Sequence, residues 1–217
     1  MRWGGICDFR CPIVTSRNFS PNEGCPPTTP LSGVGCYAPE LNKRCRRELK
    51  PTNRSWRVDE TYVRVKGRWT YLYRAVDSSG ATIDFLLAAR RNTAAAKRFF
   101  QSALRAPGHP RPRVINVDGN PSYPKVVAEL EAERKLGRRC RCRTCPYLNN
   151  IVEQDHRAIK RRVNASQGFR SFHGAQRRIQ GYEVVHMIRK GQVRRLPKGD
   201  VLGLILFLNE ILGLSAE

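Results

Sequence analysis

Three acidic residues stand out because of their place in the local sequence pattern. Asp59 lies inside WRVDETYV, whose alternation favours a strand, and Asp118 ends the short apolar run VINVD. Glu153 lies near the start of NNIVEQDHRAIKRR, a helical stretch rich in amide and basic residues. A carboxylate within a buried strand is costly unless something compensates it, and open α/β sheets place ligands beyond the carboxyl ends of their strands. We therefore expect these three side chains to converge in the folded chain.

Three convergent carboxylates suit hard divalent cations, which prefer oxygen ligands. Mg²⁺ accepts a few carboxylates and completes its coordination with water and phosphate oxygens, and Mn²⁺ takes the same ligands. Two such ions roughly 4 Å apart can activate an attacking oxygen and stabilise a leaving oxygen at phosphorus. The predicted chemistry is therefore metal-dependent phosphodiester chemistry, with Asp59, Asp118 and Glu153 as ligands.

Each acid also has a purely structural interpretation. A lone strand aspartate such as Asp59 often serves a turn or an ion pair, and Asp118 in VDGN could shape a turn. Glu153 near a helix start could simply favour the helix dipole. Their joint placement, rather than any one residue, carries the metal hypothesis.

The elements that must position these acids follow an order typical of one fold class. Residues 54–91 hold three β-branched and aromatic runs separated by turn residues, which predicts an antiparallel meander. Helical and strand patterns then alternate, and the last helical segment lies at 174–190. The predicted helices are 92–105, 123–136 and 149–163, and the predicted strands are 112–118 and 139–148. This order predicts an α/β, ribonuclease-H-like mixed five-stranded sheet with flanking helices.

The remaining segments complete the expected domain organisation. Residues 1–35 are rich in proline and glycine without apolar periodicity, which predicts a disordered arm, and 36–53 read as a short basic helical linker. The catalytic domain is expected at 54–165, followed by a basic helical segment at 166–217. Within that segment, the apolar run 201–214 is short for a bilayer and reads as a packed terminal helix.

Charge points to the class of partner. The 217 residues include 40 Lys and Arg against 18 Asp and Glu, a formal net charge of +22. Between Arg134 and Lys198 there are 18 basic and three acidic residues. A solvated basic face is one interpretation, but an excess of this size favours nucleic acid. The N-terminus lacks the pattern of a targeting signal, so we expect a cytoplasmic, nucleoid-associated protein without a membrane partner.

Eight cysteines raise the question of a zinc site. Cys140, Cys142 and Cys145 form a CxCxxC cluster, but no second pair stands at the spacing of a zinc ribbon. We therefore expect incidental, reduced thiols rather than a metal centre.

Longer blocks of this sequence resemble a known family. The 35-residue separation of Asp118 and Glu153, with Lys160 seven residues further on, is similar to the D,D,E pattern of transposases and retroviral integrases. From about Tyr37 to the C-terminus the chain resembles bacterial insertion-sequence transposases of the IS-six group, which form cointegrates. The resemblance rests on VDETYVRVKGRWTYLYRAVDSSG, NVDGNPSYPKVVAEL, YLNNIVEQDHRAIKRRVNASQGFRSF and IQGYEVVHMIRKGQV.

The resemblance implies roles for particular residues. Asp59, Asp118 and Glu153 would hold two divalent metal ions, Mg²⁺ or Mn²⁺, and Lys160 would contact the DNA backbone near the cut. Hydrolysis would free a 3′-hydroxyl at each element end, and that hydroxyl would then attack target DNA. The implied partners are the terminal inverted repeats, the target DNA and further copies of the chain. Other basic residues of the same helix are expected to contact phosphate, namely Arg157, Arg161 and Arg162.

One departure from the family leaves alternatives open. Family members place a helix-turn-helix before the YAPEL block, and residues 1–35 bear no such pattern, so we expect an N-terminally truncated or altered chain. The first hypothesis is an active transposase working as an oligomer. The second is a catalytically impaired DNA-binding remnant that interferes with an intact transposase. A cellular ribonuclease-H-like nuclease would fit the fold and metals but not the matching blocks.

Overall fold

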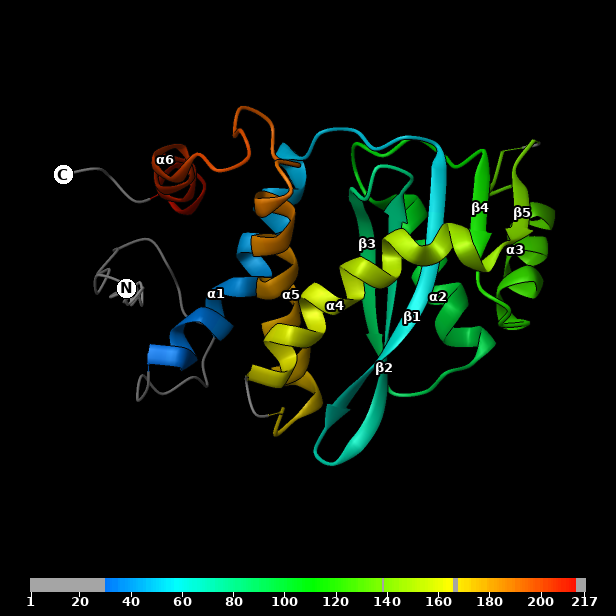
Figure 1. The fold of residues 1–217 in the computed structure, drawn as a ribbon, viewed down its shortest axis with the longest axis horizontal. Coiled ribbons are helices and arrows are strands. Elements are labelled where there is room, and N and C mark those ends of the chain that lie inside the picture. The colour runs from blue at the N-terminus through cyan, green and yellow to red at the C-terminus, as the bar shows by residue number, and fades with distance from the viewer. Residues whose placement is uncertain (1–29, 138, 166–167, 214–217) are drawn as a thin grey trace, which may run out of the picture.

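A mixed five-stranded sheet forms the centre of the protein (Figure 1). The computed structural model describes residues 30–137, 139–165 and 168–213. The strand order is β3-β2-β1-β4-β5, in which the first three strands are antiparallel and β4 and β5 run parallel to β1. The strands are β1 Ser55–Val65, β2 Arg68–Asp77, β3 Thr82–Ala88, β4 Val114–Val117 and β5 Arg141–Thr144. This is the predicted ribonuclease-H-like sheet.

Helices cover both faces of the sheet. Helices α2 and α3 bury a core of aromatic and aliphatic side chains against one face, including Trp56, Tyr73 and Phe99. Helix α4 and part of α5 cover the other face, and α1 lies beside α5 (Figure 1). The helices are α1 Pro30–Cys45, α2 Thr93–Arg105, α3 Ser122–Ala132, α4 Asn150–Ala165, α5 Phe172–Arg189 and α6 Val201–Leu212, with 3-10 turns at Arg46–Glu48 and Pro146–Asn149.

Local chemistry explains where these elements begin and turn. Lys66 and Gly67 both have positive φ values, 52° and 76°, the conformation that a two-residue hairpin turn requires. The Asn92 side chain accepts a hydrogen bond of 2.9 Å from the Ala95 N–H and so caps α2, as its position predicts. The predicted meander and helix at 92–105 are therefore confirmed.

Some element boundaries differ from the prediction. Helix α1 begins at Pro30, inside the segment expected to be a disordered arm, and residues 1–29 of that segment lie outside the described residues. Helix α3 ends at Ala132 rather than Leu136. The predicted strand 139–148 is reduced to the four residues of β5, because a 3-10 turn begins at Pro146.

The terminal helix forms as predicted but is packed on one side only. Leu204 and Phe207 of α6 contact the cluster that α1 and α5 build, whereas Val201 and Leu202 are 62% and 76% exposed. The expected terminal helix is therefore present, and among the described residues it packs on the side that carries Leu204 and Phe207. Among the described helices, none has the length and apolar character needed to cross a membrane.

Candidate active site

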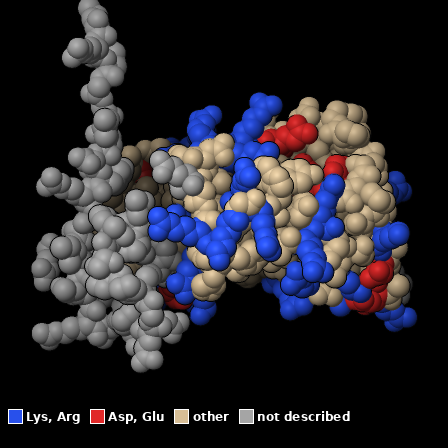
Figure 2. Space-filling model, turned by 90° about the horizontal axis from the view of Figure 1, so that it is seen from below, with Lys and Arg blue, Asp and Glu red and all other residues tan. Residues whose placement is uncertain are grey.

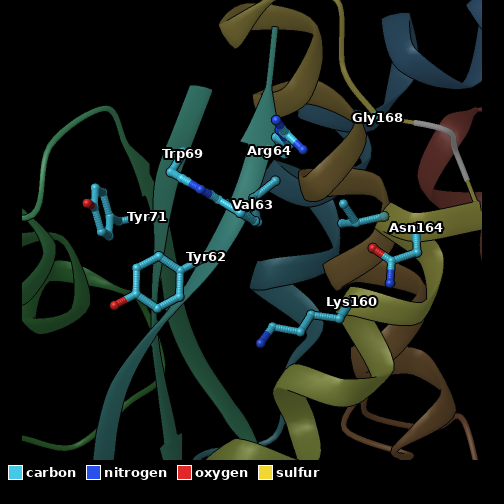
Figure 3. Close-up of a pocket in the computed structure, with 9 residues that line it drawn as sticks. Tyr62, Val63, Arg64, Trp69, Tyr71, Lys160, Asn164 and Gly168 are labelled. Atoms are coloured by element: carbon cyan, nitrogen blue, oxygen red, sulfur yellow. The ribbon is translucent and has the colours of Figure 1, made fainter. Parts of the chain in front are cut away.

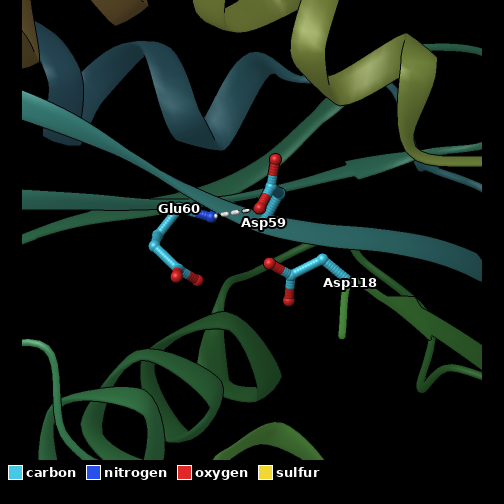
Figure 4. A group of neighbouring side chains, drawn as sticks. All are labelled: Asp59, Glu60 and Asp118. Atoms are coloured by element: carbon cyan, nitrogen blue, oxygen red, sulfur yellow. Dashed lines mark hydrogen bonds between the residues drawn. The ribbon is translucent and has the colours of Figure 1, made fainter. Parts of the chain in front are cut away.

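Two of the predicted acids meet where β1 and β4 lie side by side. Asp59 lies one residue beyond the last β1 residue that pairs with β4, and Asp118 directly follows β4. Within the described chain, the only grouping of possible metal-ligating side chains joins Asp59, Asp118 and Glu60, whose carboxylate oxygens lie within 4.8 Å of one another (Figure 4). The predicted convergence of Asp59 and Asp118 therefore appears in the folded chain.

Glu60 differs from the other two acids because basic and hydroxyl groups already engage it. Its carboxylate forms an ion pair with Arg91 and accepts hydrogen bonds from the Tyr123 hydroxyl and the Asn120 side chain. Glu60 and Asp59 also point away from opposite faces of β1 (Figure 4). Glu60 is therefore suited to hold Arg91, whose Nη2 lies 4.0 Å from Asp118 Oδ2, rather than to bind a cation itself.

Asp59 carries the least compensated charge of the cluster. Burial, and then repulsion from Asp118, raise the pKa of Asp59 to about 7. The charges of Glu60 and Glu153 act in the same direction, and a hydrogen bond from the Glu60 backbone N–H opposes them. The neighbouring His156 brings no positive charge, because burial lowers its pKa to about 3. A divalent cation would relieve this repulsion, so the donors present fit such an ion.

Glu153 lies outside the 4.8 Å grouping but on the predicted element. It lies in the first turn of α4 with an exposed side chain, and its charge reaches Asp59 strongly enough to help raise that pKa. The structure thus places Asp59 and Asp118 together and Glu153 nearby. That all three are catalytic stays a prediction.

Two buried amides fasten the start of α4 to both acid-bearing strands. The Asn149 side chain donates to the Val58 carbonyl at 3.2 Å, one residue before Asp59. The Asn116 side chain donates to Asn149 Oδ1 at 2.7 Å, and Asn116 lies two residues before Asp118. Because both amides are buried, these bonds fix where α4 begins and so where Glu153 lies.

A buried ionic network, which we call the Arg74 network, joins α4 to β2 and α5. Arg74 on β2 is fully buried and contacts Asp155 of α4 at 2.8 Å and Glu183 of α5 at 2.9 Å. Asp155 also contacts Lys190 Nζ at 2.9 Å and His186 Nε2 at 2.7 Å. The network ties β2, α4 and α5 together two residues from Glu153.

Basic side chains are frequent on the surface of the protein. In Figure 2, Lys and Arg are spread over the described face, whereas Asp and Glu form only a few small groups. Lys160, Arg157 and Arg161 of α4 are exposed. Arg162 is half-buried and donates to the Tyr182 carbonyl at 3.0 Å, so it also anchors α4 to α5. That these four residues bind DNA stays a prediction.

The side chains of the cysteine cluster do not gather into a group of possible metal ligands within the described residues. Cys140, Cys142 and Cys145 are free thiols, and none belongs to a grouping of possible ligands there. Burial raises the pKa of Cys140 to about 11, so this side chain is a thiol at neutral pH when no metal is bound.

Several supporting residues were not found from the sequence. Arg91 was missed, although a basic pair at the end of a predicted strand could have drawn attention to it. The Asn116–Asn149 pair was missed as well, because nothing in a sequence pairs residues 33 positions apart. Arg74 sits in a strand whose alternation gives no sign of a charge buried in the core.

Comparisons with known proteins agree with this geometry. A family model described as a DDE domain matches residues 53–192. The transposase for insertion sequence-like element IS431mec of Staphylococcus aureus is 36% identical over 160 residues, which cover 74% of this chain and 69% of the relative. The transposase for insertion sequence element IS257 in transposon Tn4003, from the same species, matches over the same shares at the same identity.

Solved structures to which the chain is similar are more distant in sequence. The HTLV-2 integrase catalytic core domain in complex with magnesium, in its trimeric form, is 20% identical, with a TM-score of 0.44 over 53% of this chain and 72% of that one. The catalytic core domain of BIV integrase is 15% identical, with a TM-score of 0.47 over 75% of this chain and 99% of that one.

Proposed function

Because this chain belongs to the DDE domain family of transposases, we propose that Asp59, Asp118 and Glu153 form its catalytic site. The activity is that of a polynucleotidyl transferase in DNA transposition. The observation that carries the residue assignment is the approach of Asp59 and Asp118, with a charge that the described side chains leave largely uncompensated. Glu153 completes the set from the first turn of α4.

The donors are carboxylate oxygens, which matches a requirement for divalent metal. We propose two Mg²⁺ ions, with Mn²⁺ as the alternative, held by Asp59, Asp118 and Glu153. When bound, such ions supply charge neutralisation at the phosphate and activation of the attacking oxygen. Glu60 does not join them in this proposal, since Arg91 and Tyr123 already hold its oxygens.

The surrounding residues position the reacting strand. Asn149 fixes the start of α4 against β1, and Glu153 lies in the first turn of that helix. Lys160, Arg157 and Arg161 lie on the same helix and offer positive charge to the DNA backbone. Arg91, held by Glu60 beside Asp118, offers a further cation to a phosphate at the site.

Two displacements at phosphorus fit one such site. In the first, a water oxygen bonds to phosphorus at the element end and the 3′-oxygen leaves as a hydroxyl. In the second, that hydroxyl attacks a target phosphate and the target's own 3′-oxygen leaves. Since two element ends must meet in this scheme, we propose that the chain acts as a homo-oligomer on its terminal inverted repeats and on target DNA.

A strand-transfer assay tests this proposal. The purified full chain, with Mg²⁺, is given labelled duplexes that carry pre-cut element ends, and joined products are resolved on a denaturing gel. Joining should fall at least about a hundredfold in Asp118→Ala and in Glu153→Gln, since each change removes a charge that the metal ions need. The matched control is Glu131→Gln, an exposed carboxyl on α3, which should join DNA like the unchanged protein. Equal joining by Glu153→Gln and by the control would remove Glu153 from the site.

A further inference from the structure

A groove runs along the free edge of β1, next to the carboxylates. Only Ser55–Val58 of β1 pair with β4, so among the described residues this edge has no strand beside it beyond Asp59, apart from a single bridge between Val65 and Phe169. The groove has a volume of about 890 Å³, within the range of pockets that hold small ligands. The β1–β2 hairpin forms one wall and the second half of α4 forms the other (Figure 3).

The hairpin wall is aromatic and open to solvent. Trp69 is 59% exposed and Tyr62 is 47% exposed, although large aromatic side chains are normally well covered. Their ring centroids lie 6.2 Å apart in an edge-on arrangement, and Tyr71 lies 5.4 Å from Tyr62 across the strand pair. The three rings contact one another at one wall of the groove (Figure 3). Trp69 and Tyr62 are not part of the hydrophobic core, so the faces of these two rings are open to a ligand.

The groove carries positive charge. Lys160 lies on the α4 wall, and the Arg64 guanidinium lies 5.6 Å from the centre of the Trp69 ring. No Asp or Glu is among the described residues that line it. The occupant is therefore expected to combine negative charge with flat aromatic surfaces, which is the chemistry of nucleotides. Bases in a duplex hide their faces by stacking, so the rings could stack only on unpaired nucleotides.

The groove lies further along the two elements that carry Asp59 and Glu153. Tyr62 lies three residues beyond Asp59 on β1, about 10 Å at the rise of a strand. Lys160 lies seven residues beyond Glu153 on α4, about 10 Å at the rise of a helix. Along the backbone, both walls are therefore about equally far from the acids, and the Tyr62 side chain leaves β1 on the face of Glu60, opposite to that of Asp59.

We propose that this groove binds an unpaired segment of the DNA strand next to the phosphate at the carboxylates. Bases stack on Trp69 and Tyr62, while Lys160 and Arg64 contact the backbone. The position of the cut strand rests on the proposed function, but the groove's preference for unpaired DNA does not need catalysis. A peptide is the competing occupant of a free strand edge, and it predicts no preference for unpaired nucleotides.

Binding without metal separates the groove from catalysis. The full chain is titrated, in EDTA, with a blunt duplex and with the same duplex bearing a short single-stranded tail, and binding is followed by fluorescence anisotropy. Trp69→Ala should weaken binding to the tailed DNA about five- to tenfold, as expected for a lost base–aromatic stack, and leave blunt DNA within about twofold. Trp69→Phe should retain most of the affinity. The control Tyr37→Ala, which removes an exposed ring from α1, should change neither affinity.

Tryptophan emission gives a second measurement on the same proteins. The chain has three tryptophans, and Trp3 lies outside the described residues, so the emission is measured in proteins that all carry Trp3→Phe. Trp56 is buried at 1% exposure, so quenching by tailed DNA in this background should come largely from Trp69 and should mostly disappear when Trp69→Phe is added. The proposal is overturned if Trp69→Ala weakens tailed and blunt DNA equally, or neither. If the protein prefers tailed DNA but joins no DNA with Mg²⁺, the proposed DNA binding in the groove stands and the proposed catalytic function is refuted.

Discussion

The surroundings of a buried carboxylate shift its pKa in opposite directions in the acid cluster at Asp59 and in the Arg74 network. Burial, with repulsion from neighbouring acids, raises the pKa of Asp59 to about 7. Burial also acts to raise the pKa of Asp155, but a hydrogen bond from His186 and the charge of Arg74 outweigh it and hold that pKa well below its usual range. The two regions are close, because Asp155 lies on α4 one residue before His156, whose Nδ1 is 3.6 Å from Asp59 Oδ2.

The difference lies in the counter-charges that the chain itself supplies. In the Arg74 network, the positive charges of Arg74 and Lys190 balance the negative charges of Asp155 and Glu183. Around Asp59 and Asp118, the chain supplies Arg91, which Glu60 already holds. A folded chain that leaves buried acids unbalanced stores repulsion that an external cation can relieve. The contrast thus separates acids that a bound cation would stabilise from acids whose charge the chain itself balances.

Removing Arg74 should have the largest effect on stability. Arg74→Met leaves Asp155 and Glu183 buried without their shared partner, which should lower the free energy of unfolding by about 3–5 kcal/mol. Urea denaturation followed by circular dichroism measures this loss. The matched variant Arg105→Met, at an exposed arginine that ends α2, should cost less than about 0.5 kcal/mol. Similar losses in both variants would mean that the network adds nothing beyond a generic arginine.

Removing a charge from the acid cluster should raise the stability of the protein, whereas removing Arg74 is expected to lower it. Because the folded pKa of Asp59 is raised from 3.8 to about 7, the folded protein binds more protons than the unfolded chain between these values. The contribution of Asp59 therefore lowers stability as pH rises through this window. At pH 8 in EDTA, Asp59→Asn should be more stable than the unchanged protein by roughly 2–4 kcal/mol, and the difference should shrink towards pH 4.

Thermal unfolding across pH 4–8 measures this effect, and Mg²⁺ sharpens it. The ion should stabilise the unchanged protein at pH 8 more than it stabilises Asp59→Asn, because the variant has lost one ligand. Glu131→Gln serves as the control for loss of a carboxyl elsewhere. If Asp59→Asn were less stable than the unchanged protein at every pH, Asp59 would belong with the balanced acids of the Arg74 network.

The sequence predicts the acid cluster much better than it predicts the network. Asp59 and Asp118 lie at positions that strand periodicity and strand ends identify, so their approach follows from the topology of the sheet. Arg74 and Glu183 are 109 residues apart, and nothing local distinguishes a buried arginine from a solvated one. Glu60 shows the same limit, because its neighbour Asp59 has the same chemistry and only the contacts with Arg91 and Tyr123 separate their roles.

The smallest effect is expected where the two regions are joined through α4. Asn149→Ala removes the bonds to Val58 and Asn116, leaves a buried carbonyl without its donor, and should cost about 1–3 kcal/mol. The Arg74 network still holds α4, so the protein should remain folded. Because Glu153 loses its fixed place, strand transfer should need a higher Mg²⁺ concentration, by about tenfold, to reach half of its maximum.

The adjacent exposed residue provides the matched control for this step. Asn150→Ala removes the same side chain one position later in the chain, where it is exposed, and should leave both stability and the Mg²⁺ requirement unchanged. The informative measurement is the Mg²⁺ titration at a temperature where both variants are fully folded, since a purely structural role for Asn149 would change the melting temperature alone. A Mg²⁺ midpoint that shifts in Asn149→Ala but not in Asn150→Ala would show that the hydrogen bonds of Asn149 set the position of Glu153 relative to Asp59 and Asp118. The Arg74 network would then contribute only to the stability of α4.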